Sequence, residues 1–189
     1  TLACYARPGQ RWSFYEIDPT VIQLARDDGR FTFLKRCLPN PDIELGDARL
    51  SLAAAAPGGL DLLALDAFSS DSVPMHLMTT EAFAAYARVL SPKGLLLVHI
   101  SNRFMDLRPV VSAAAVAGGW QAAELAYYPD ELAAKEGATG SNWIALSQDR
   151  GTILALKAKN PAWSPLNRYP HFTPWSDDYA TILPLLKGY

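Results

Sequence analysis

Apolar and polar residues alternate along this chain in a way that predicts strands separated by helices. Residues 11–17 (RWSFYEI) alternate and lead into acids, which is typical of a strand that enters a loop. Residues 60–65 (LDLLAL) and 95–100 (LLLVHI) are nearly continuous apolar runs. Such runs are typical of strands that helices cover on both faces. Further strands are predicted at 42–46, 120–128 and 142–147.

Capping residues predict the helices between these strands. Asp18 supplies an N-cap and Pro19 a first-turn proline, and an apolar helix face follows them. Asp47 and Ala48 open an alanine-rich helix that stops at Pro57. Helices are also predicted at 80–90, at 109–117 and at 177–186, the last within an irregular tail that begins at residue 160 and is rich in proline and tryptophan.

The alternation of strands and helices predicts an α/β fold with a mostly parallel sheet. Two successive strands near the end of the chain, with no predicted helix between them, add an antiparallel hairpin to that sheet. No internal repeat or low-complexity linker divides residues 1–189, so a single domain is expected.

Composition narrows the classes of function. Half of the 189 residues are hydrophobic and 19% are charged, which favours a packed core over a disordered chain. The net charge of −2 gives no electrostatic footprint for nucleic acid, and no apolar run reaches the roughly 18 residues that cross a bilayer. Two cysteines form no disulfide framework and match no zinc spacing, so a reducing, cytoplasmic setting without a metal site is expected.

Polar residues gather at the predicted ends of successive strands. In open α/β sheets, ligands bind beyond the carboxyl ends of the strands. The residues at these ends are Glu16, Asp18, Asp47, Asp66, Asp71, His99, Ser101 and Asn102. We therefore expect a ligand site along this edge of the sheet.

Two of these acids suit a nucleoside, although each also has a structural explanation. A carboxylate at the position of Glu16 can accept hydrogen bonds from the two hydroxyls of a ribose, or it can be a solvated acid at a strand end. Asp47 can cap a helix, contact an adenine amino group, or do both.

The remaining candidates suit an amine. Asp66 ends the most apolar strand, where burial would favour its neutral form and a cationic substrate its charged form. Asp71 lies in a serine-rich loop, where it can flank an amine or make a local turn bond. His99, a hydrogen-bonded core residue or a site residue, and Trp143, which can border a pocket, complete the set.

Short motifs follow one another along the chain: YEIDP at 15–19, GDAR at 46–49, LDAFSSD at 65–71, LMTTEAF at 77–83, LSPKG at 90–94 and WSDD at 175–178. In this order they resemble the polyamine aminopropyltransferases, the spermidine synthase family. The likeness is greatest to a divergent branch of spermidine-synthase-like proteins, through VHISNR at 98–103. It covers roughly residues 1–150.

The resemblance implies a Rossmann-like class I methyltransferase fold and transfer of an aminopropyl group from decarboxylated S-adenosylmethionine to a diamine such as putrescine, without a metal. It implies that Glu16, with Asp18 beside it, holds the ribose, and that Asp47 and Ala48 contact the adenine. Asp66 then corresponds to the acid that accepts the proton of the attacking amine. The residues implied for the amine pocket are Asp66, Asp71, His99 and Trp143. A homo-oligomer is also implied, and members of the divergent branch are often fused to a membrane transporter-like half.

Several departures from the family pattern bear on the activity. The glycine-rich turn, the first strand and the N-terminal β-hairpin domain have no counterpart, so we expect the natural chain to extend upstream of Thr1 or another segment to fill that place. His99 stands where typical members carry glutamine, and residues 138–143 replace a tyrosine-proline motif. Two alternatives therefore stay open: a methyltransferase that uses S-adenosylmethionine with another acceptor, and a catalytically silent nucleoside-binding domain.

Overall fold

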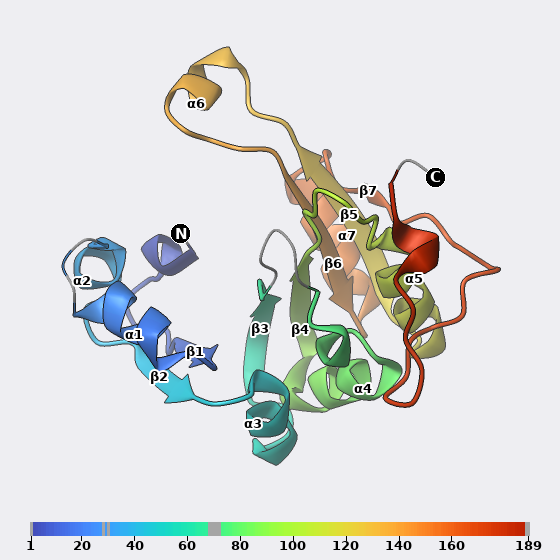
Figure 1. The fold of residues 1–189 in the computed structure, drawn as a ribbon, viewed down its shortest axis with the longest axis horizontal. Helices are drawn as coiled ribbons and strands as arrows, with labels where there is room; N and C mark the ends of the chain where they lie inside the picture. The colour runs from blue at the N-terminus through green and yellow to red at the C-terminus, as the bar shows by residue number, and fades with distance from the viewer. Residues whose placement is uncertain (1, 28, 30, 68–72, 188–189) are drawn as a thin grey trace. The chain divides into compact units, whose positions relative to one another are not determined.

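The computed structural model describes residues 2–27, 29, 31–67 and 73–187. These residues form two compact units, an N-terminal unit (Thr1–Ala55) and a C-terminal unit (Ala56–Tyr189). Each unit has its own β-sheet, and helices follow the strands in both (Figure 1). The predicted α/β class is therefore confirmed.

Two parallel strands organise the N-terminal unit. Strand β1 (Ser13–Glu16) pairs with β2 (Asp42–Leu45), and Glu16 lies opposite Leu45 at their carboxyl ends. Helix α1 (Pro19–Arg26) follows β1, and α3 (Ala48–Ala54) follows β2. Both helices begin directly after the aspartate that the sequence predicts as their N-cap.

A short helix in the N-terminal unit was not predicted. Helix α2 (Phe33–Cys37) has five residues, and the side chain of its N-cap residue Thr32 makes no capping hydrogen bond. A helix of this length, without such a bond, has neither a periodic apolar face nor a capping signal that sequence patterns can detect.

Cys4 and Cys37 form a disulfide between the 3-10 helix η1 (Leu2–Tyr5) and α2. Their Cα atoms lie 4.6 Å apart, although the cysteines are 33 positions apart in the chain. The prediction that the two cysteines form no disulfide framework is therefore wrong for this pair. The pairing depends on how the chain folds back to η1, which sequence patterns do not show. The cytoplasmic setting stays a prediction, and because the two cysteines are paired, they no longer support it.

A mixed sheet of five strands organises the C-terminal unit. Its order is β3-β4-β6-β5-β7. The β3–β4 pair is parallel, whereas the β4–β6, β5–β6 and β5–β7 pairs are antiparallel. The predicted hairpin is confirmed as the β5–β6 pair. The strands are β3 (Leu60–Leu65), β4 (Leu90–His99), β5 (Gln121–Tyr127), β6 (Ser141–Ser147) and β7 (Ser164–Pro165).

The predicted strands differ from the observed ones in two details. Strand β3 is not buried on both faces, since Asp61 is exposed and Leu62 is 46% exposed. The reason is its position at the end of the sheet order, where it pairs with β4 alone among the described residues. Strand β4 begins at Leu90 instead of the predicted residue 95, next to an irregularity in the β3–β4 register.

The helices of the C-terminal unit include two that were not predicted. Helices α4 (Thr80–Val89) and α5 (Arg108–Ala117) lie close to their predicted bounds. Helices α6 (Glu131–Lys135) and α7 (Arg150–Lys159) were missed, although Asp130 and Asp149 cap them. Helix α6 buries no residue, and in α7 the buried Ile153 and the partly buried Leu156 pack on the core, so the apolar face of each helix is too short to give a clear periodic pattern.

The tail is anchored on the first turn of α4. Trp175 is fully buried, and its carbonyl oxygen accepts a hydrogen bond from the Thr80 backbone at 2.8 Å. The Thr79 hydroxyl donates to Asp177 Oδ1 at 2.8 Å and also accepts from the Ala82 backbone. In place of the helix predicted at 177–186, this part of the tail contains the 3-10 helix η3 (Leu183–Leu185).

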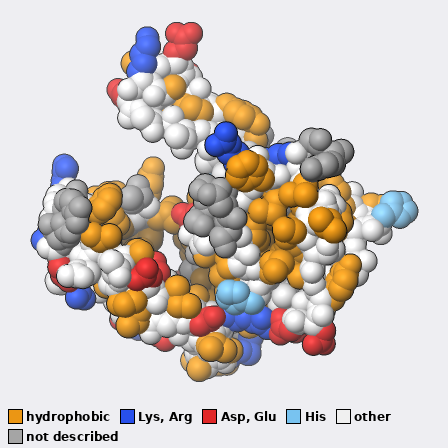
Figure 2. All heavy atoms as spheres, in the orientation of Figure 1, with side chains coloured by type: hydrophobic (Ala, Val, Ile, Leu, Met, Phe, Trp, Pro, Cys, Tyr) orange, Lys and Arg blue, Asp and Glu red, His pale blue; other side chains and the backbone are white. Residues whose placement is uncertain are grey.

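The segment between β5 and β6 forms an arm that extends away from the sheet and carries α6 (Figure 1). Tyr128 and Leu132 on this arm are 78% and 69% exposed. Figure 2 shows acidic and basic side chains together at the end of the arm.

The 3-10 helix η2 (Met75–Leu77) precedes α4. In the described part of the chain, no helix has both the length and the apolar character needed to cross a membrane.

Candidate active site

A polar cluster of the C-terminal unit lies at the carboxyl ends of β3 and β4. Asp66 directly follows β3, and His99 is the last residue of β4. Because the strands are parallel, with Leu65 opposite Val98, their carboxyl ends meet at one edge of the sheet. Asp66 Oδ1 lies 2.6 Å from His99 Nδ1. The structure therefore brings these two predicted site residues into hydrogen-bonding contact.

The His99 ring is held at both nitrogens and on one face. It stacks on Trp143, directly opposite on β6, with ring centroids 4.6 Å apart and an interplanar angle of 21°. His99 Nε2 lies 2.7 Å from Ser101 Oγ. The Ser101 oxygen in turn accepts a hydrogen bond from the Asn142 backbone at 2.8 Å. These contacts leave the imidazole little freedom to rotate.

Asp66 is the more exposed member of the pair. Its side chain is 49% exposed, whereas that of His99 is 22% exposed. Among the described residues, Oδ1 of Asp66 contacts His99 and Oδ2 has no hydrogen-bond partner. A carboxylate with one oxygen anchored and the other open can orient an ammonium group and accept a proton from it. The apolar strand end expected around Asp66 is thus only partly buried.

Glu16 and Asp18 lie together at the carboxyl end of β1 in the N-terminal unit. Glu16 Oε1 accepts a hydrogen bond from the Asp18 backbone at 3.0 Å. Asp18 Oδ1 accepts from the Thr20 backbone at 2.7 Å and thereby caps α1. The other oxygen of Glu16 has no partner among the described residues, and such an oxygen can accept a hydrogen bond from a sugar hydroxyl.

Asp47 and Ala48 lie at the neighbouring end of β2. Asp47 Oδ1 accepts from the backbone of Arg49 and Leu50, so the capping role considered for it is present. Gly46 precedes it with φ of 154°, a conformation that glycine favours, and donates to the Glu16 carbonyl at 3.0 Å. The β1–β2 pairing therefore places Glu16, Asp18, Asp47 and Ala48 along one edge of this small sheet.

Two site residues stand differently from the rest. Asp71 lies outside the described residues, so its predicted place beside the amine stays a prediction.

Ser101 is a polar residue at a predicted strand end to which sequence analysis assigns no role. The detectable signal was its spacing from His99, because residues two apart in extended chain point to the same face.

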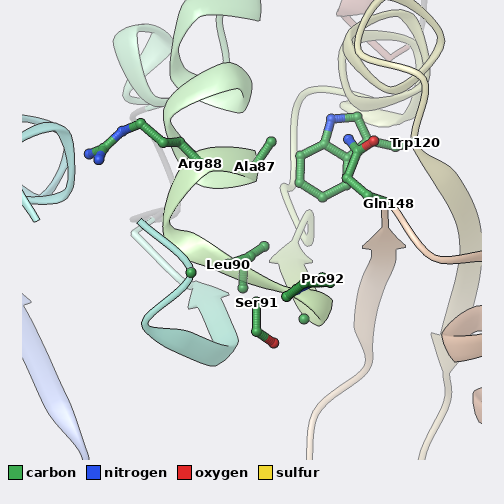
Figure 3. A pocket seen from close by; sticks show the side chains of 9 residues that line it. Ala87, Arg88, Leu90, Ser91, Pro92, Trp120 and Gln148 are labelled. Atoms are coloured by element: carbon green, nitrogen blue, oxygen red, sulfur yellow. The ribbon is translucent and has the colours of Figure 1, made fainter. Parts of the chain in front are cut away.

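The opposite end of β4 borders a separate cavity of about 310 Å³. Arg88, Trp120 and Gln148 are among its lining residues, and the Arg88 side chain points away from the other two (Figure 3). None of the residues predicted to form the site lines this cavity. Across the described residues, no group of three or more His, Cys, Asp or Glu side chains could hold a metal ion.

A curated relative resembles about half of the chain. The polyamine aminopropyltransferase of Vibrio vulnificus (strain CMCP6) is 33% identical over 99 residues, which are 51% of this chain and 31% of that protein. The match thus spans about a third of the length of that relative. No family model matches the chain.

Solved structures resemble most of the chain. A probable spermidine synthase from Corynebacterium glutamicum ATCC 13032 matches with a TM-score of 0.62 and 19% identity, over 96% of this chain and 70% of that one. Spermidine synthase from Thermotoga maritima matches with a TM-score of 0.53 and 14% identity, over 89% of this chain and 54% of that one. These likenesses show an α/β fold of the S-adenosylmethionine-dependent methyltransferase type. The sequence identity to the curated relative, over about half of the chain, shows distant homology to the polyamine aminopropyltransferases.

Proposed function

We propose that this chain transfers an aminopropyl group from decarboxylated S-adenosylmethionine to a diamine such as putrescine, giving spermidine and methylthioadenosine. The observation that carries the proposal is the Asp66–His99 pair, in which one carboxylate oxygen is anchored at 2.6 Å and the other has no hydrogen-bond partner among the described residues. Distant homology to the aminopropyltransferases supports the choice of donor and acceptor.

The reaction requires a proton acceptor at the amine. An alkylammonium group has no lone pair, so it must lose a proton before it can act as a nucleophile. Asp66 Oδ2 takes this proton, the nitrogen forms a bond to the methylene carbon, and the carbon–sulfur bond breaks with its electron pair going to sulfur. The sulfonium becomes a neutral thioether, the product amine is a secondary ammonium, and Asp66 then releases the proton to water. One proton is released in each turnover.

Orientation supplies the rest of the acceleration. Holding a nucleophile and its target in line is worth about 7 to 11 kcal/mol in intramolecular reactions. The carboxylate of Asp66 orients the ammonium, and its negative charge favours the approach of a cationic amine to a cationic sulfonium. In this proposal His99 and Trp143 border the amine, and Asp71 is a second acid that contacts it.

The N-terminal unit provides the residues proposed for the donor. Glu16, with Asp18 beside it, accepts hydrogen bonds from the ribose hydroxyls, and Asp47 with Ala48 contacts the adenine. The open oxygen of Glu16 among the described residues supports the first of these roles. The homo-oligomer, the fused membrane half and the cytoplasmic location that the resemblance implies stay predictions.

Replacement of Asp66 by asparagine tests the proposed base. The amide side chain would still accept a hydrogen bond from His99 but would lack the charge and the basicity, so we expect kcat to fall by about 10²- to 10⁴-fold. Asp61→Asn is the matched control, because Asp61 is an exposed acid near the start of the same strand. If Asp66→Asn keeps near-normal turnover, Asp66 is not the base.

Calorimetric titration separates the proposal from its alternatives. We expect binding of methylthioadenosine, weakened by Glu16→Gln, and binding of putrescine, weakened by Asp66→Asn. Binding of methylthioadenosine with no response to any amine would contradict amine transfer and favour a silent nucleoside-binding domain. Turnover with S-adenosylmethionine but not with its decarboxylated form would instead identify a methyltransferase.

A further inference from the structure

We infer that Ser101 is a positioning residue that acts through His99 to hold Asp66 ready for the amine. Ser101 is not proposed to touch either substrate. Its hydroxyl contacts His99 Nε2, the ring nitrogen farther from Asp66. The part of this inference that concerns amine binding rests on the proposed function, whereas the hydrogen-bond chain rests on the geometry alone. The chain runs from the Asn142 backbone through Ser101 and His99 to Asp66.

The groups at the two ends of the hydrogen-bond chain, the Asn142 N–H and the Asp66 carboxylate, set the direction of its bonds. A backbone N–H can only donate, so Ser101 Oγ accepts from Asn142. An ionised carboxylate can only accept, so the 2.6 Å contact to Asp66 places a proton on His99 Nδ1. The Nε2 of a neutral ring then has a lone pair, and the Ser101 hydroxyl is the group within 2.7 Å that can donate to it.

This direction matters because imidazole has two neutral tautomers. With the proton on Nδ1, the ring donates to Asp66 Oδ1 and stabilises the carboxylate, which leaves Oδ2 for the ammonium. With the proton on Nε2, a lone pair would face the carboxylate at 2.6 Å and repel it. The Ser101 hydroxyl favours the first tautomer, since the hydrogen bond made by one ring nitrogen sets the proton on the other.

The residues have the connectivity of a serine–histidine–aspartate triad, but the surroundings of Ser101 differ from those of a nucleophile. A nucleophilic serine must present its oxygen to a carbonyl group beside an oxyanion site. Here Ser101 Oγ is engaged by both the Asn142 backbone and His99. Ser101 also ties the end of β4 to the start of β6, next to the Ile100–Asn142 backbone bond of 2.8 Å. These contacts suit positioning.

Imidazole nitrogen NMR of the whole chain tests the hydrogen-bond chain directly. In the neutral ring we expect the His99 proton on Nδ1, so the spectra are recorded at a pH above which the nitrogen shifts no longer change. Ser101→Ala should shift the Nε2 resonance, because that lone pair loses its hydrogen bond while Asp66 still holds the proton on Nδ1. Ser101→Thr, which keeps the hydroxyl, should restore the original shift. Ser91→Ala, at the opposite end of β4, should change nothing. A proton on Nε2 in the unmodified chain, or an unchanged spectrum in Ser101→Ala, would overturn the inference.

A double-mutant comparison separates positioning from simple support of the fold. An asparagine in place of His99 can reproduce the Nδ1 donor without a second ring nitrogen. Because His99 borders the proposed amine, the putrescine affinity of His99→Asn is measured as the baseline of its own pair of variants. Ser101→Ala alone should weaken the putrescine affinity of the unmodified chain about tenfold, equivalent to about 1.4 kcal/mol. In the His99→Asn background, Ser101→Ala should have no further effect. If Ser101 only supported the fold, Ser101→Ala would weaken putrescine binding by the same factor in both backgrounds. That result would contradict the inference.

The outcomes distinguish this inference from the proposed function. If putrescine binds through Asp66 but Ser101→Ala leaves both the affinity and the Nε2 resonance of His99 unchanged, the proposed function stands and the inference is wrong. If the Nε2 resonance responds as expected but no amine binds, the hydrogen-bond chain stands, while the proposed function and the amine role of Ser101 are wrong. Covalent labelling of Ser101 by a fluorophosphonate would show a nucleophile and overturn the positioning role.

Discussion

Replacement of Thr79 by valine should destabilise the C-terminal unit substantially while keeping the shape of the side chain. Thr79 is 2% exposed and its hydroxyl makes two bonds. It accepts from the Ala82 backbone at 3.2 Å, as the N-cap of α4, and donates to Asp177 Oδ1 at 2.8 Å. Valine removes both interactions and leaves a buried backbone N–H without its partner.

The expected cost follows from these two interactions. Loss of an N-cap costs about 1 kcal/mol, and loss of a hydrogen bond to a charged group costs about 1.5 to 3 kcal/mol. Because Asp177 is exposed and can turn to water, the sum should lie at about 2 to 4 kcal/mol. For a chain of this size, that corresponds to a fall in Tm of about 4 to 16 °C.

Urea denaturation followed by tryptophan fluorescence measures this change, since four of the five tryptophans lie in the C-terminal unit. Thr173→Val is the control, because Thr173 is an exposed residue of the same tail. The double variant Thr79→Val with Asp177→Asn should cost less than the sum of the single variants. A free energy of unfolding for Thr79→Val within about 0.5 kcal/mol of the unmodified chain would refute the reasoning.

Two further predictions concern stability. Cys37→Ala should destabilise the N-terminal unit by about 3 to 4 kcal/mol, because the disulfide closes a loop between positions 33 apart; hydrogen exchange of the β1 and β2 amides measures this, and unchanged protection would contradict it. Burial by itself raises the pKa of Asp106, but hydrogen bonds from the Arg108 side chain and backbone outweigh it and lower that pKa below its usual value. Asp106→Asn should therefore be less stable than the unmodified chain at pH 7. Since the native carboxylate loses its contribution as pH falls through the lowered pKa, the difference should shrink below about pH 4 in urea titrations; a difference that persists there would contradict the assignment.

Local signals in the sequence were sufficient for much of the fold. Asp18 and Asp47 cap the helices predicted from them, because a cap bonds backbone groups only two or three residues away. The apolar run Leu60–Leu65 is a strand with the predicted bounds. Helix α2 was missed because it is short and has no side-chain capping bond, and α7 because its apolar face is short.

For the candidate site, the sequence alone identified the types of group and the strand ends that carry them. Asp66, His99 and Trp143 were each recognised, but their contacts depend on which strands are neighbours and in what register. The parallel β3–β4 pair brings Asp66 to His99, and the antiparallel β4–β6 pair brings Trp143 and the Asn142 backbone to the same end. Ser101 acquires its role only through these two pairings.

The primary structure thus determined the α/β class, the capped helices and the acids at the strand ends, since each depends on neighbours a few positions away. Only the tertiary structure decided the disulfide between Cys4 and Cys37, the exposed edge of β3 and the hydrogen-bond chain that ends at Asp66. The physical reason is that these contacts join residues about 30 to 40 positions apart, and their distances are set by strand register and chain reversal rather than by local propensity.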